Sequence, residues 1–592
     1  MANYIGLHVG HNASVALMIN GKIKYCLQEE RFAKIKNFCG FPKQSLNFLE
    51  KYIKSTKIKI DEIGISTKEI NLFLLKYPLN HFFSVEEYHN FYGKDFYGKV
   101  LKGKSVSNYI RNLRKDKRFK NYNSIYSKTP DSKILNSFAY YRNITTNYLK
   151  KNHPLISNKI NYLDHHTCHA YYGRFSIKYI NNEKSCVVVI DSYGDRNTET
   201  IWIDDGKRNL RNILKNNQCE LARIYKFVTL ILNMKPDEHE FKVMGMAPYG
   251  KKKYYLEIYE NVFKNILKLD GLKIVHKKRP KDLYNYLKKK LSNYRFDNVS
   301  AALQYYLEKT ILELLKKINK RYRINNFYFS GGVSMNVKMY NLFIKEKFIK
   351  KLHNAPSGSD ESLSMGACYF LNRSKKSLPL NSVSIGSPLI DVSKIEKKLL
   401  KYKRKIKIKK NVSHKYIAKL LQKNKIIAIA QGNEEFGARA LGNRSIIVNP
   451  SDLGNIMKIN AKIKNRDFWM PFAITILKQH HKIFIKNPKA LESPFMNLSF
   501  DTISKNYEKI KAGCHPLDKT VRPQILDQAS NKNFFNIINE FYKLTKIPAV
   551  LNTSLNLHGY PKSSDLSSVL ETFFKSELNY LYLENKILIK KR

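Results

Sequence analysis

The chain has 592 residues, and its 106 Lys and Arg against 48 Asp and Glu give a formal net charge of +58 at pH 7. This length is beyond the size at which a single hydrophobic core stops growing, which argues against a one-domain protein. The seven cysteines form no Cys-x-x-Cys pair, which argues against a disulfide scaffold, and no apolar run is long enough to span a bilayer. We therefore expect two α/β domains in a reduced, cytoplasmic setting, without a signal peptide.

The N-terminal segment predicts a strand, a turn of small residues and a returning strand between Tyr4 and Leu17. Asn20-Gly21 then gives a hairpin signal that leads into the next strand. The turn of small residues contains His11 and Asn12, and it could cradle a phosphate.

The segment 82–152 is rich in Tyr, Asn and Lys and lacks a clean periodicity. Aromatic rings interleaved with cations can stack on sugars or bases. We favour a different interpretation, an inserted helical subdomain that packs these rings internally.

Two histidines, His165 and His169, stand four residues apart in a segment predicted to be helical, which places them on one face. This is a common geometry for two imidazoles that share a metal, although ordinary helix faces also show it. Asp191 ends a hydrophobic run and Asp360 precedes a predicted helix start, so both carboxylates could complete the ligand shell. Neutral imidazoles suit Fe²⁺, Zn²⁺ or Mn²⁺.

The aromatic run 327–329 predicts a strand, and Gly331-Gly332 follows it closely. The missing side chains there would let a purine or ribose lie against the backbone. Taken alone, a Gly-Gly pair is more often a simple turn.

The polar stretch 374–377 predicts a domain boundary near residue 377. Beyond it, residues 435–445 set Arg439 and Arg444 among glycines and other small residues. Such a loop can hold a phosphate, because arginine offers a planar fork of donors and glycine lets backbone N–H groups approach an anion. A surface turn with solvated arginines is the alternative interpretation.

Three further segments carry cationic, amide or hydroxyl side chains. They are residues 462–473 with Lys464 and Arg466, residues 518–524 with Arg522, and residues 551–556 with Asn552 and Ser554. The last segment follows an apolar strand, and open α/β sheets bind ligands at the carboxyl ends of their strands. The four segments together predict one polyanion pocket.

In this order and at this spacing, the four segments resemble the O-carbamoyltransferases of the NodU/CmcH type. The family pattern of E-F-G-x-R-A-L-G-x-R-S, K-x-R-E with R-P-F-A-P, D-x-T-x-R-x-Q and L-N-T-S-F-N is matched with four departures, and the resemblance covers nearly the whole chain. The departures are Asp467 for Glu, Met470 for Arg, Ile474 for Pro and Leu555 for Phe. The departure at Met470 removes one expected cation from the pocket.

The resemblance implies an α/β protein with a duplicated actin- or Hsp70-like (ribonuclease H-like) domain over 1–377, an insertion near 82–152, and a YrdC-like domain over 378–592. The metal ligands that it implies are His165, His169, Asp191 and Asp360, with Fe²⁺ preferred and Mn²⁺ or Zn²⁺ as alternatives. It implies N-terminal nucleotide-binding residues at Asn12, Gly194, Glu240, Gly245, Gly331, Gly332 and Asn336. It implies C-terminal residues for carbamoyl phosphate and ATP at Arg439, Arg444, Lys464, Arg466, Arg522, Asn552 and Ser554.

By the same resemblance, the C-terminal domain makes carbamoyl adenylate from carbamoyl phosphate and ATP with Mg²⁺, and the N-terminal domain transfers the carbamoyl group. His11 stands where the family has a histidine suited to take the proton of the acceptor hydroxyl. We expect the acceptor to be a saccharide or another small molecule with a hydroxyl group. The sequence leaves open which acceptor is used and whether the chain forms a homodimer.

Three other functions are weighed against this one. A tRNA threonylcarbamoyladenosine-type enzyme is favoured by the basic charge but not by the fused domain order. A hydrogenase-maturation carbamoyltransferase would need Cys-x-x-Cys zinc motifs, and a non-enzymatic ATP-dependent switch would leave the arginine pocket without a task. Lysine is abundant along the whole chain together with Asn, Ile and Tyr, which is typical of AT-rich coding, so we do not expect a nucleic-acid partner.

Overall fold

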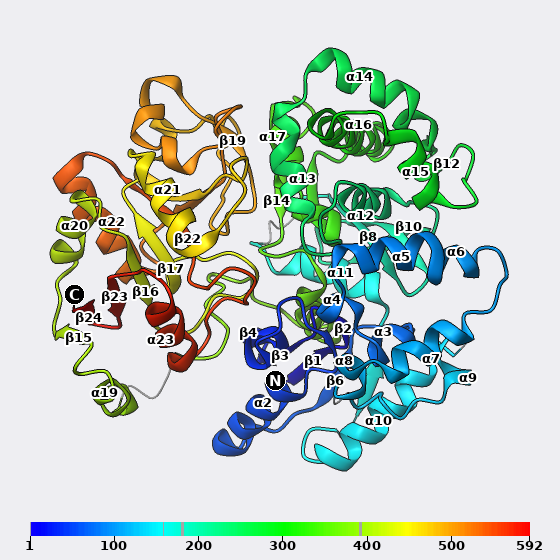
Figure 1. Ribbon diagram of the computed structural model, residues 1–592, viewed down its shortest axis with the longest axis horizontal. Coiled ribbons are helices and arrows are strands. Elements are labelled where there is room, and N and C mark those ends of the chain that lie inside the picture. Colours follow the sequence, from blue (N-terminus) through cyan, green and yellow to red (C-terminus); the bar gives the residue numbers. More distant parts are fainter. Residues whose placement is uncertain are drawn as a thin grey trace. The chain divides into compact units, whose positions relative to one another are not determined.

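The computed structural model describes residues 2–122, 124–135, 137–157, 159–178, 183–389 and 393–591. It consists of two compact units (Figure 1). The first unit contains Met1–Lys24 and Asn37–Pro379, and the second contains Tyr25–Lys36 and Leu380–Arg592. Within the described ranges, no helix is both long enough and apolar enough to cross a membrane.

Two five-stranded sheets of the same topology form the centre of the first unit. One has the order β4-β3-β1-β6-β7, with the strands Lys22–Gln28, Ser14–Ile19, Asn3–His8, Glu62–Ile65 and Ile160–Tyr162. The part of β4 from Tyr25 onward is counted with the second unit. The other has the order β10-β9-β8-β13-β14, with the strands Leu210–Asn216, Asn197–Asp204, Ser185–Gly194, Asn326–Ser330 and Lys351–Asn354. In both sheets the central strand pairs antiparallel on one side and parallel on the other. This repeat confirms the duplicated, actin-like α/β fold that was predicted.

Two helices pack against each other and against both sheets. They are α11 (His165–Phe175), which contacts β8 and β13, and α18 (Leu363–Leu371), which contacts β1 and β3. Gly366 allows the close approach, because a Cβ at this position would lie 2.0 Å from the carbonyl oxygen of Cys168. The packing of α11 against α18 places the two histidines of α11 near the ends of β8 and β13.

A group of helices lies around the second sheet. They include α12 (Leu221–Ile231), α13 (Glu240–Met246), α14 (Lys252–Asn261), α15 (Leu283–Leu291), α16 (Phe296–Tyr322) and α17 (Val337–Lys345). Among them, α12 contacts β8.

The segment predicted as an insertion is helical. Its helices are α4 (Leu79–Phe82), α5 (Val85–Asn90), a π-helix (Phe91–Asp95), α6 (Tyr97–Val100), α7 (Ser107–Lys115), α8 (Lys117–Lys120), α9 (Asp131–Ile134) and α10 (Tyr140–Asn152), preceded by α3 (Leu72–Lys76). Several of its rings pack on one another. Phe96 stacks on Phe91 with ring centroids 4.9 Å apart and on Phe73 with centroids 4.7 Å apart. Internal packing therefore accounts for much of its aromatic content.

The second unit is built on an eight-stranded mixed sheet with the order β15-β24-β23-β16-β17-β22-β18-β21. In that order the strands are Ile406–Lys409, Lys586–Lys590, Tyr580–Leu583, Ile427–Ala430, Arg444–Val448, Ala549–Ser554, Ala473–Leu477 and Pro523–Leu526. Its main helices are α20 (His414–Gln422), α22 (Lys532–Thr545) and α23 (Leu566–Lys575). As predicted, an apolar strand, β22, ends in the polar Asn-Thr-Ser sequence, and Thr553 and Ser554 still pair with β17. The α/β class of this half is thus confirmed, while its likeness to YrdC stays a prediction.

Candidate functional site

Four side chains from three parts of the first unit converge on one point. The Nε2 atoms of His165 and His169 lie 3.3 and 3.1 Å from Oδ2 of Asp191. They lie 3.7 and 3.4 Å from Oδ1 of Asp360. One potential ligand atom from each residue falls within 4.8 Å of all the others. Two nitrogens and two carboxylate oxygens at this spacing fit a divalent ion that accepts mixed N/O ligands.

Local structure explains why these residues meet. The side chain of Asp164 accepts a hydrogen bond from the N–H of Thr167 and so caps α11 one residue before His165. Asp191 lies in β8 where its pairing with β9 becomes irregular after Ile190. Asp360 opens the 3₁₀ turn Asp360–Ser362 that leads into α18.

The imidazoles are oriented by partners at their other ring nitrogens. Nδ1 of His169 lies 3.3 Å from Oγ of Ser330, and Nδ1 of His165 lies 3.5 Å from Oγ1 of Thr67. Partners of this kind fix the tautomer of a metal-binding histidine. Burial opposes a charge on His165, but the hydrogen bond to Asp191 and the charge of Asp360 outweigh it and raise its pKa to about 9.

Three neighbouring residues are outside the group of four potential ligands. His166 contacts Oγ1 of Thr200 at 3.3 Å, and burial raises the pKa of the Cys168 thiol well above its usual range. His8 was not singled out from the sequence. Its Nε2 donates to the carbonyl oxygen of His11 at 2.9 Å, and its ring centroid lies 6.2 Å from that of His165.

Three of the glycines assigned to nucleotide binding lie against this cluster. A Cβ at Gly194 would come within 2.2 Å of the His165 ring, and a Cβ at Gly332 within 2.9 Å of Oδ1 of Asp191. Gly331 has φ +86°, and a Cβ there would meet the carbonyl oxygen of Ile190 at 2.6 Å. Close backbone approach to the cluster therefore requires glycine here, whatever ligand lies beside it.

The other predicted N-terminal residues are more dispersed. Asn336 caps α17 and exchanges two hydrogen bonds with Gln304, so its amide is already engaged. Glu240 and Gly245 lie on α13, and burial together with the charge of Asp237 raises the pKa of Glu240 to about 7.

His11 and Asn12 lie at the predicted turn. His11 is in the short strand β2 (Gly10–His11), which pairs with β5 (Cys39–Gly40), and Asn12 has φ +56°. Burial raises the pKa of Asp237, but the positive charge of Lys226 outweighs burial and lowers that pKa overall.

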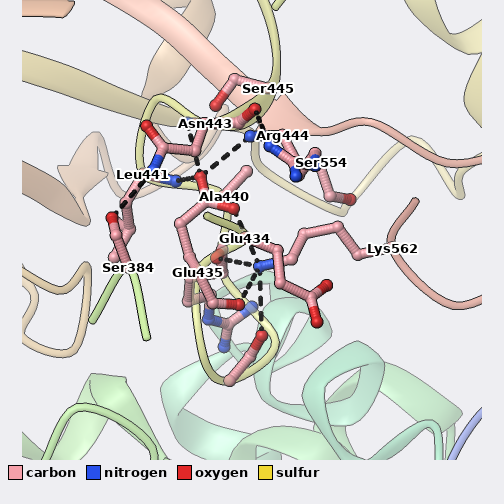
Figure 2. Close-up of polar contacts among 12 residues, drawn as sticks. Ser384, Glu434, Glu435, Ala440, Leu441, Asn443, Arg444, Ser445, Ser554 and Lys562 are labelled. Atoms are coloured by element: carbon pink, nitrogen blue, oxygen red, sulfur yellow. Dashed lines mark hydrogen bonds and ion pairs between the residues drawn. The ribbon is translucent and has the colours of Figure 1, made fainter. Parts of the chain in front are cut away.

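In the second unit, the loop 435–445 is held from inside by a buried carboxylate (Figure 2). Oε1 of Glu435 accepts hydrogen bonds from the N–H groups of Leu441, Asn443 and Arg444 at 2.8, 2.7 and 3.1 Å. Its other oxygen lies 3.2 Å from Nζ of Lys562. The sequence drew attention to the arginines of this loop and missed the glutamate that folds it.

Lys562 holds the opposite side of the same loop. Its Nζ donates to the carbonyl oxygens of Glu435 and Arg439 at 2.7 and 3.0 Å. Arg31, from the segment Tyr25–Lys36 of this unit, donates to the carbonyl oxygen of Gly437 at 2.9 Å. Three buried charged side chains thus fix the loop's backbone.

Arg444, which the sequence predicts to bind phosphate, is fully buried and donates to backbone carbonyls instead. Its acceptors are the carbonyl oxygens of Gln431, Asn443, Gly432 and Ser564, at 2.7 to 3.1 Å for its terminal nitrogens. Its donors are therefore used inside the protein, and the geometry favours a role in positioning the loop.

Arg439, Arg466 and Arg522 come together as a cluster of like charges. Burial, and then the charge of Arg439, lowers the pKa of Arg466 to about 10. Burial, Arg439 and Arg466 hold the pKa of Arg522 well below its usual range. Neither Arg466 nor Arg522 forms an ion pair with a residue that the structure describes. The arrangement of Arg466 and Arg522, two buried cations without acidic partners among the described residues, is one that an anion would stabilise.

The remaining predicted residues of this half border the cluster. Lys464 donates to Oδ1 of Asn556 at 2.7 Å and to Oγ of Ser554 at 3.2 Å. Arg466 donates to Oγ1 of Thr553 at 3.2 Å. Asn552 donates to the carbonyl oxygen of Ala440, which ties β22 to the loop 435–445.

Comparison with known proteins gives the class. Residues 3–369 match the family described as "Carbamoyltransferase N-terminus", and residues 418–591 match "Carbamoyltransferase C-terminus". The chain therefore belongs to the carbamoyltransferase family and is a carbamoyltransferase enzyme.

Three relatives illustrate the range of the family. "Uncharacterized protein MJ1051" of Methanocaldococcus jannaschii is 29% identical over 99% of this chain and 99% of its own length. "Nodulation protein NolNO" of Sinorhizobium fredii is 28% identical over 74% of this chain and 64% of its own length. "Nodulation protein NolO" of Bradyrhizobium diazoefficiens is 27% identical over 73% of this chain and 79% of its own length.

Proposed function

We propose that this carbamoyltransferase activates the carbamoyl group of carbamoyl phosphate with ATP and transfers it to a hydroxyl group of a saccharide or another small molecule. The observation that carries the proposal is the cluster of Arg439, Arg466 and Arg522. These side chains concentrate positive charge without a paired carboxylate on Arg466 or Arg522. Guanidinium groups match phosphate oxygens in both charge and geometry.

The proposed reaction has two stages. Carbamoyl phosphate and water give carbamate and phosphate, and a carbamate oxygen then attacks the α-phosphorus of ATP, releasing pyrophosphate and leaving carbamoyl adenylate. The acceptor's hydroxyl oxygen next attacks the carbamoyl carbon, which releases AMP. Two phosphate compounds are consumed in the first stage, which suits a site rich in arginine, and ATP would enter with Mg²⁺.

We assign the first stage to the YrdC-like half, residues 378–592, and the second to the actin-like half, residues 1–377. In the first stage Arg439, Arg466 and Arg522 would neutralise phosphate charge, supported by Lys464. Glu435, Lys562 and Arg444 would keep the loop backbone fixed, which lowers the cost of reorganisation when charge develops.

In the second stage His165, His169, Asp191 and Asp360 would hold a divalent metal, for which Fe²⁺ or Mn²⁺ suits the donors at least as well as Zn²⁺. When bound, such an ion supplies Lewis acidity toward phosphate or carbonyl oxygens. His11 would take the proton from the acceptor hydroxyl. Gly331 and Gly332 would lie beside the bound nucleotide.

A second candidate function, modification of tRNA through a threonylcarbamoyl adenylate, is favoured by the net charge of +58. One set of assays separates the two. The wild type is incubated with candidate nucleotide-sugars as hydroxyl acceptors. Mass spectrometry should then detect a single added carbamoyl group on at least one of them. Threonine-dependent labelling of tRNA, without labelling of any such acceptor, would instead establish the second function.

The division of labour is tested with two variants and a control. Arg439→Ala should abolish adenylate formation, whereas His165→Ala should form the adenylate and fail to transfer it. Arg404→Ala, which changes an exposed arginine of the same unit, should leave both stages unchanged. Equal loss of adenylate formation in the first two variants would contradict the assignment.

A further inference from the structure

A cavity of about 390 Å³ lies within the helical segment 83–118. Its walls come from α5, the π-helix, α6, α7 and α8. This volume is within the range of pockets that hold small organic ligands. No residue of the proposed carbamoyl chemistry lines it.

The charges in the cavity wall are mostly paired with one another. Nη2 of Arg118 lies 2.7 Å from Oε1 of Glu87 and 2.7 Å from Oδ2 of Asp116. Asp95 and Lys99, of opposite charge, are the other ionisable acid and base in the wall. A phosphate or sulfate would meet three carboxylates here, and the single remaining lysine would not offset them. The wall therefore disfavours an anion, and its three acids and two bases nearly balance one another, which suits a neutral ligand.

Three asparagines in the wall have unused hydrogen-bonding capacity. Among the residues that the structure describes, the side-chain amides of Asn90, Asn108 and Asn112 form no hydrogen bond. Each amide offers two donors and an acceptor with two lone pairs. Amides and a carboxylate such as Asp95 form the bidentate contacts that pairs of hydroxyl groups require.

The same wall presents aromatic carbon. Phe83 and Tyr109 line the cavity, and the Tyr109 ring packs against Phe96 with centroids 5.6 Å apart, which fixes its orientation. A fixed ring is a platform for the apolar face of a sugar. The π-helix Phe91–Asp95 ends in the wall at Asp95, and π-helical turns are frequent at functional sites.

We propose that this cavity binds a neutral saccharide, with the amides and Asp95 on its hydroxyl groups and the ring of Tyr109 on its carbon face. The site is a recognition site outside the carbamoyl-transfer machinery, and it goes beyond the proposed function.

The test measures binding to the full chain without ATP or carbamoyl phosphate, so the result does not depend on carbamoyl chemistry. Fluorescently labelled neutral oligosaccharides of glucose, galactose, mannose, rhamnose and N-acetylglucosamine are titrated and followed by polarisation. At least one should bind saturably. A sulfated oligosaccharide of the same length should bind more weakly than the best neutral one.

The variants Asn90→Ala and Asn112→Ala should each weaken that binding roughly fivefold, as expected for the loss of one or two hydrogen bonds. Asn121→Ala, at an exposed asparagine outside the cavity wall, is the matched control and should bind like the wild type. The proposal is overturned if no neutral oligosaccharide binds, if the sulfated probe binds best, or if both cavity variants bind like the control. Pyrophosphate release should be unchanged in all three variants, which separates a failure here from a failure of the proposed function.

Discussion

Replacing Lys562 by methionine should destabilise the second unit strongly, because it removes the only lysine that holds the inner face of the loop 435–445 in the described structure. The change deletes the ion pair with Glu435 and the donors to two or more loop carbonyls. Methionine has a similar length and no charge, so the effect reports the lost ammonium group rather than a lost volume.

The expected magnitude comes from two independent arguments. Removing one partner of a buried ion pair typically costs about 3–5 kcal/mol. Burial alone would raise the pKa of Glu435, but Lys562 and the loop N–H groups outweigh it and lower that pKa from 4.5 to about 2. The whole shift corresponds to about 3 kcal/mol of folding free energy at neutral pH, and this is an upper bound for the pair, because the loop N–H groups and Arg444 cause part of it and burial lowers the pKa of Lys562. Arg31 and Arg444 remain in the variant, so we expect a value near 3 kcal/mol.

The assay uses the two tryptophans of the chain, one in each unit. In a Trp202→Phe background, Trp469 alone reports on the second unit. Urea unfolding followed by its fluorescence gives the free energy of unfolding for this unit in wild type, Lys562→Met, Glu435→Gln and the double variant. The loss of unfolding free energy in the double variant should be smaller than the sum of the losses in the two single variants, because each single variant leaves one buried charge unpaired.

Lys575→Met is the matched control. Lys575 lies on α23 and pairs with Glu571 at 2.7 Å, but its side chain is 61% exposed, so the change should destabilise the unit far less than Lys562→Met does. If Lys562→Met behaved like this control, and the double variant were additive, the buried pair would not be what fixes the loop.

Four further predictions follow from the same geometry. His169→Ala should lose bound metal and transfer activity together, whereas Cys168→Ser keeps both; an empty site in Cys168→Ser, measured by elemental analysis, would contradict the ligand set. Gly332→Ala should lower metal content, because its Cβ would lie 2.9 Å from Oδ1 of Asp191, while Gly93→Ala, whose Cβ meets nothing closer than 3.5 Å, should not. Arg174→Met should destabilise the first unit by about 3–5 kcal/mol, because it leaves the buried Asp204 without its partner at 2.7 Å. Trp202 fluorescence in a Trp469→Phe background measures the free energy of unfolding, and a cost below about 1 kcal/mol would refute the prediction. The stability difference between wild type and Glu435→Gln should be constant above about pH 4.5 and shrink as the pH falls toward 2, because the folded-state pKa of Glu435 is the lower one; a difference that grows on acidification would show the opposite sign.

Much of the first unit could be predicted from sequence because its signals are local. The strand, turn and hairpin near Asn20-Gly21 follow from period and turn chemistry, and His165 and His169 share a face because they lie four residues apart on one helix. Asp191 and Asp360 come from distant segments. The packing of α11 on α18, together with the position of the end of β8, shows how these two carboxylates meet the histidines. The sequence does not show it.

The role of Arg444 could not be predicted, because nothing local distinguishes an arginine that binds phosphate from one that binds carbonyl groups. The distinction depends on Ser564 and Gln431, which are distant in sequence. The same holds for Arg31, whose partner Gly437 is more than 400 positions away in the chain. A buried lysine such as Lys562 carries no sequence signal, since lysine is the commonest solvated residue of this chain.

The central claim, that the chain activates carbamoyl phosphate with ATP at a cluster of arginines, is tested most directly by pyrophosphate release without any acceptor or tRNA. The wild type should release pyrophosphate only when both ATP and carbamoyl phosphate are present, and Arg522→Met should reduce the release at least tenfold while Arg404→Met does not. Pyrophosphate release that is independent of carbamoyl phosphate, or unchanged in Arg522→Met, would contradict the account.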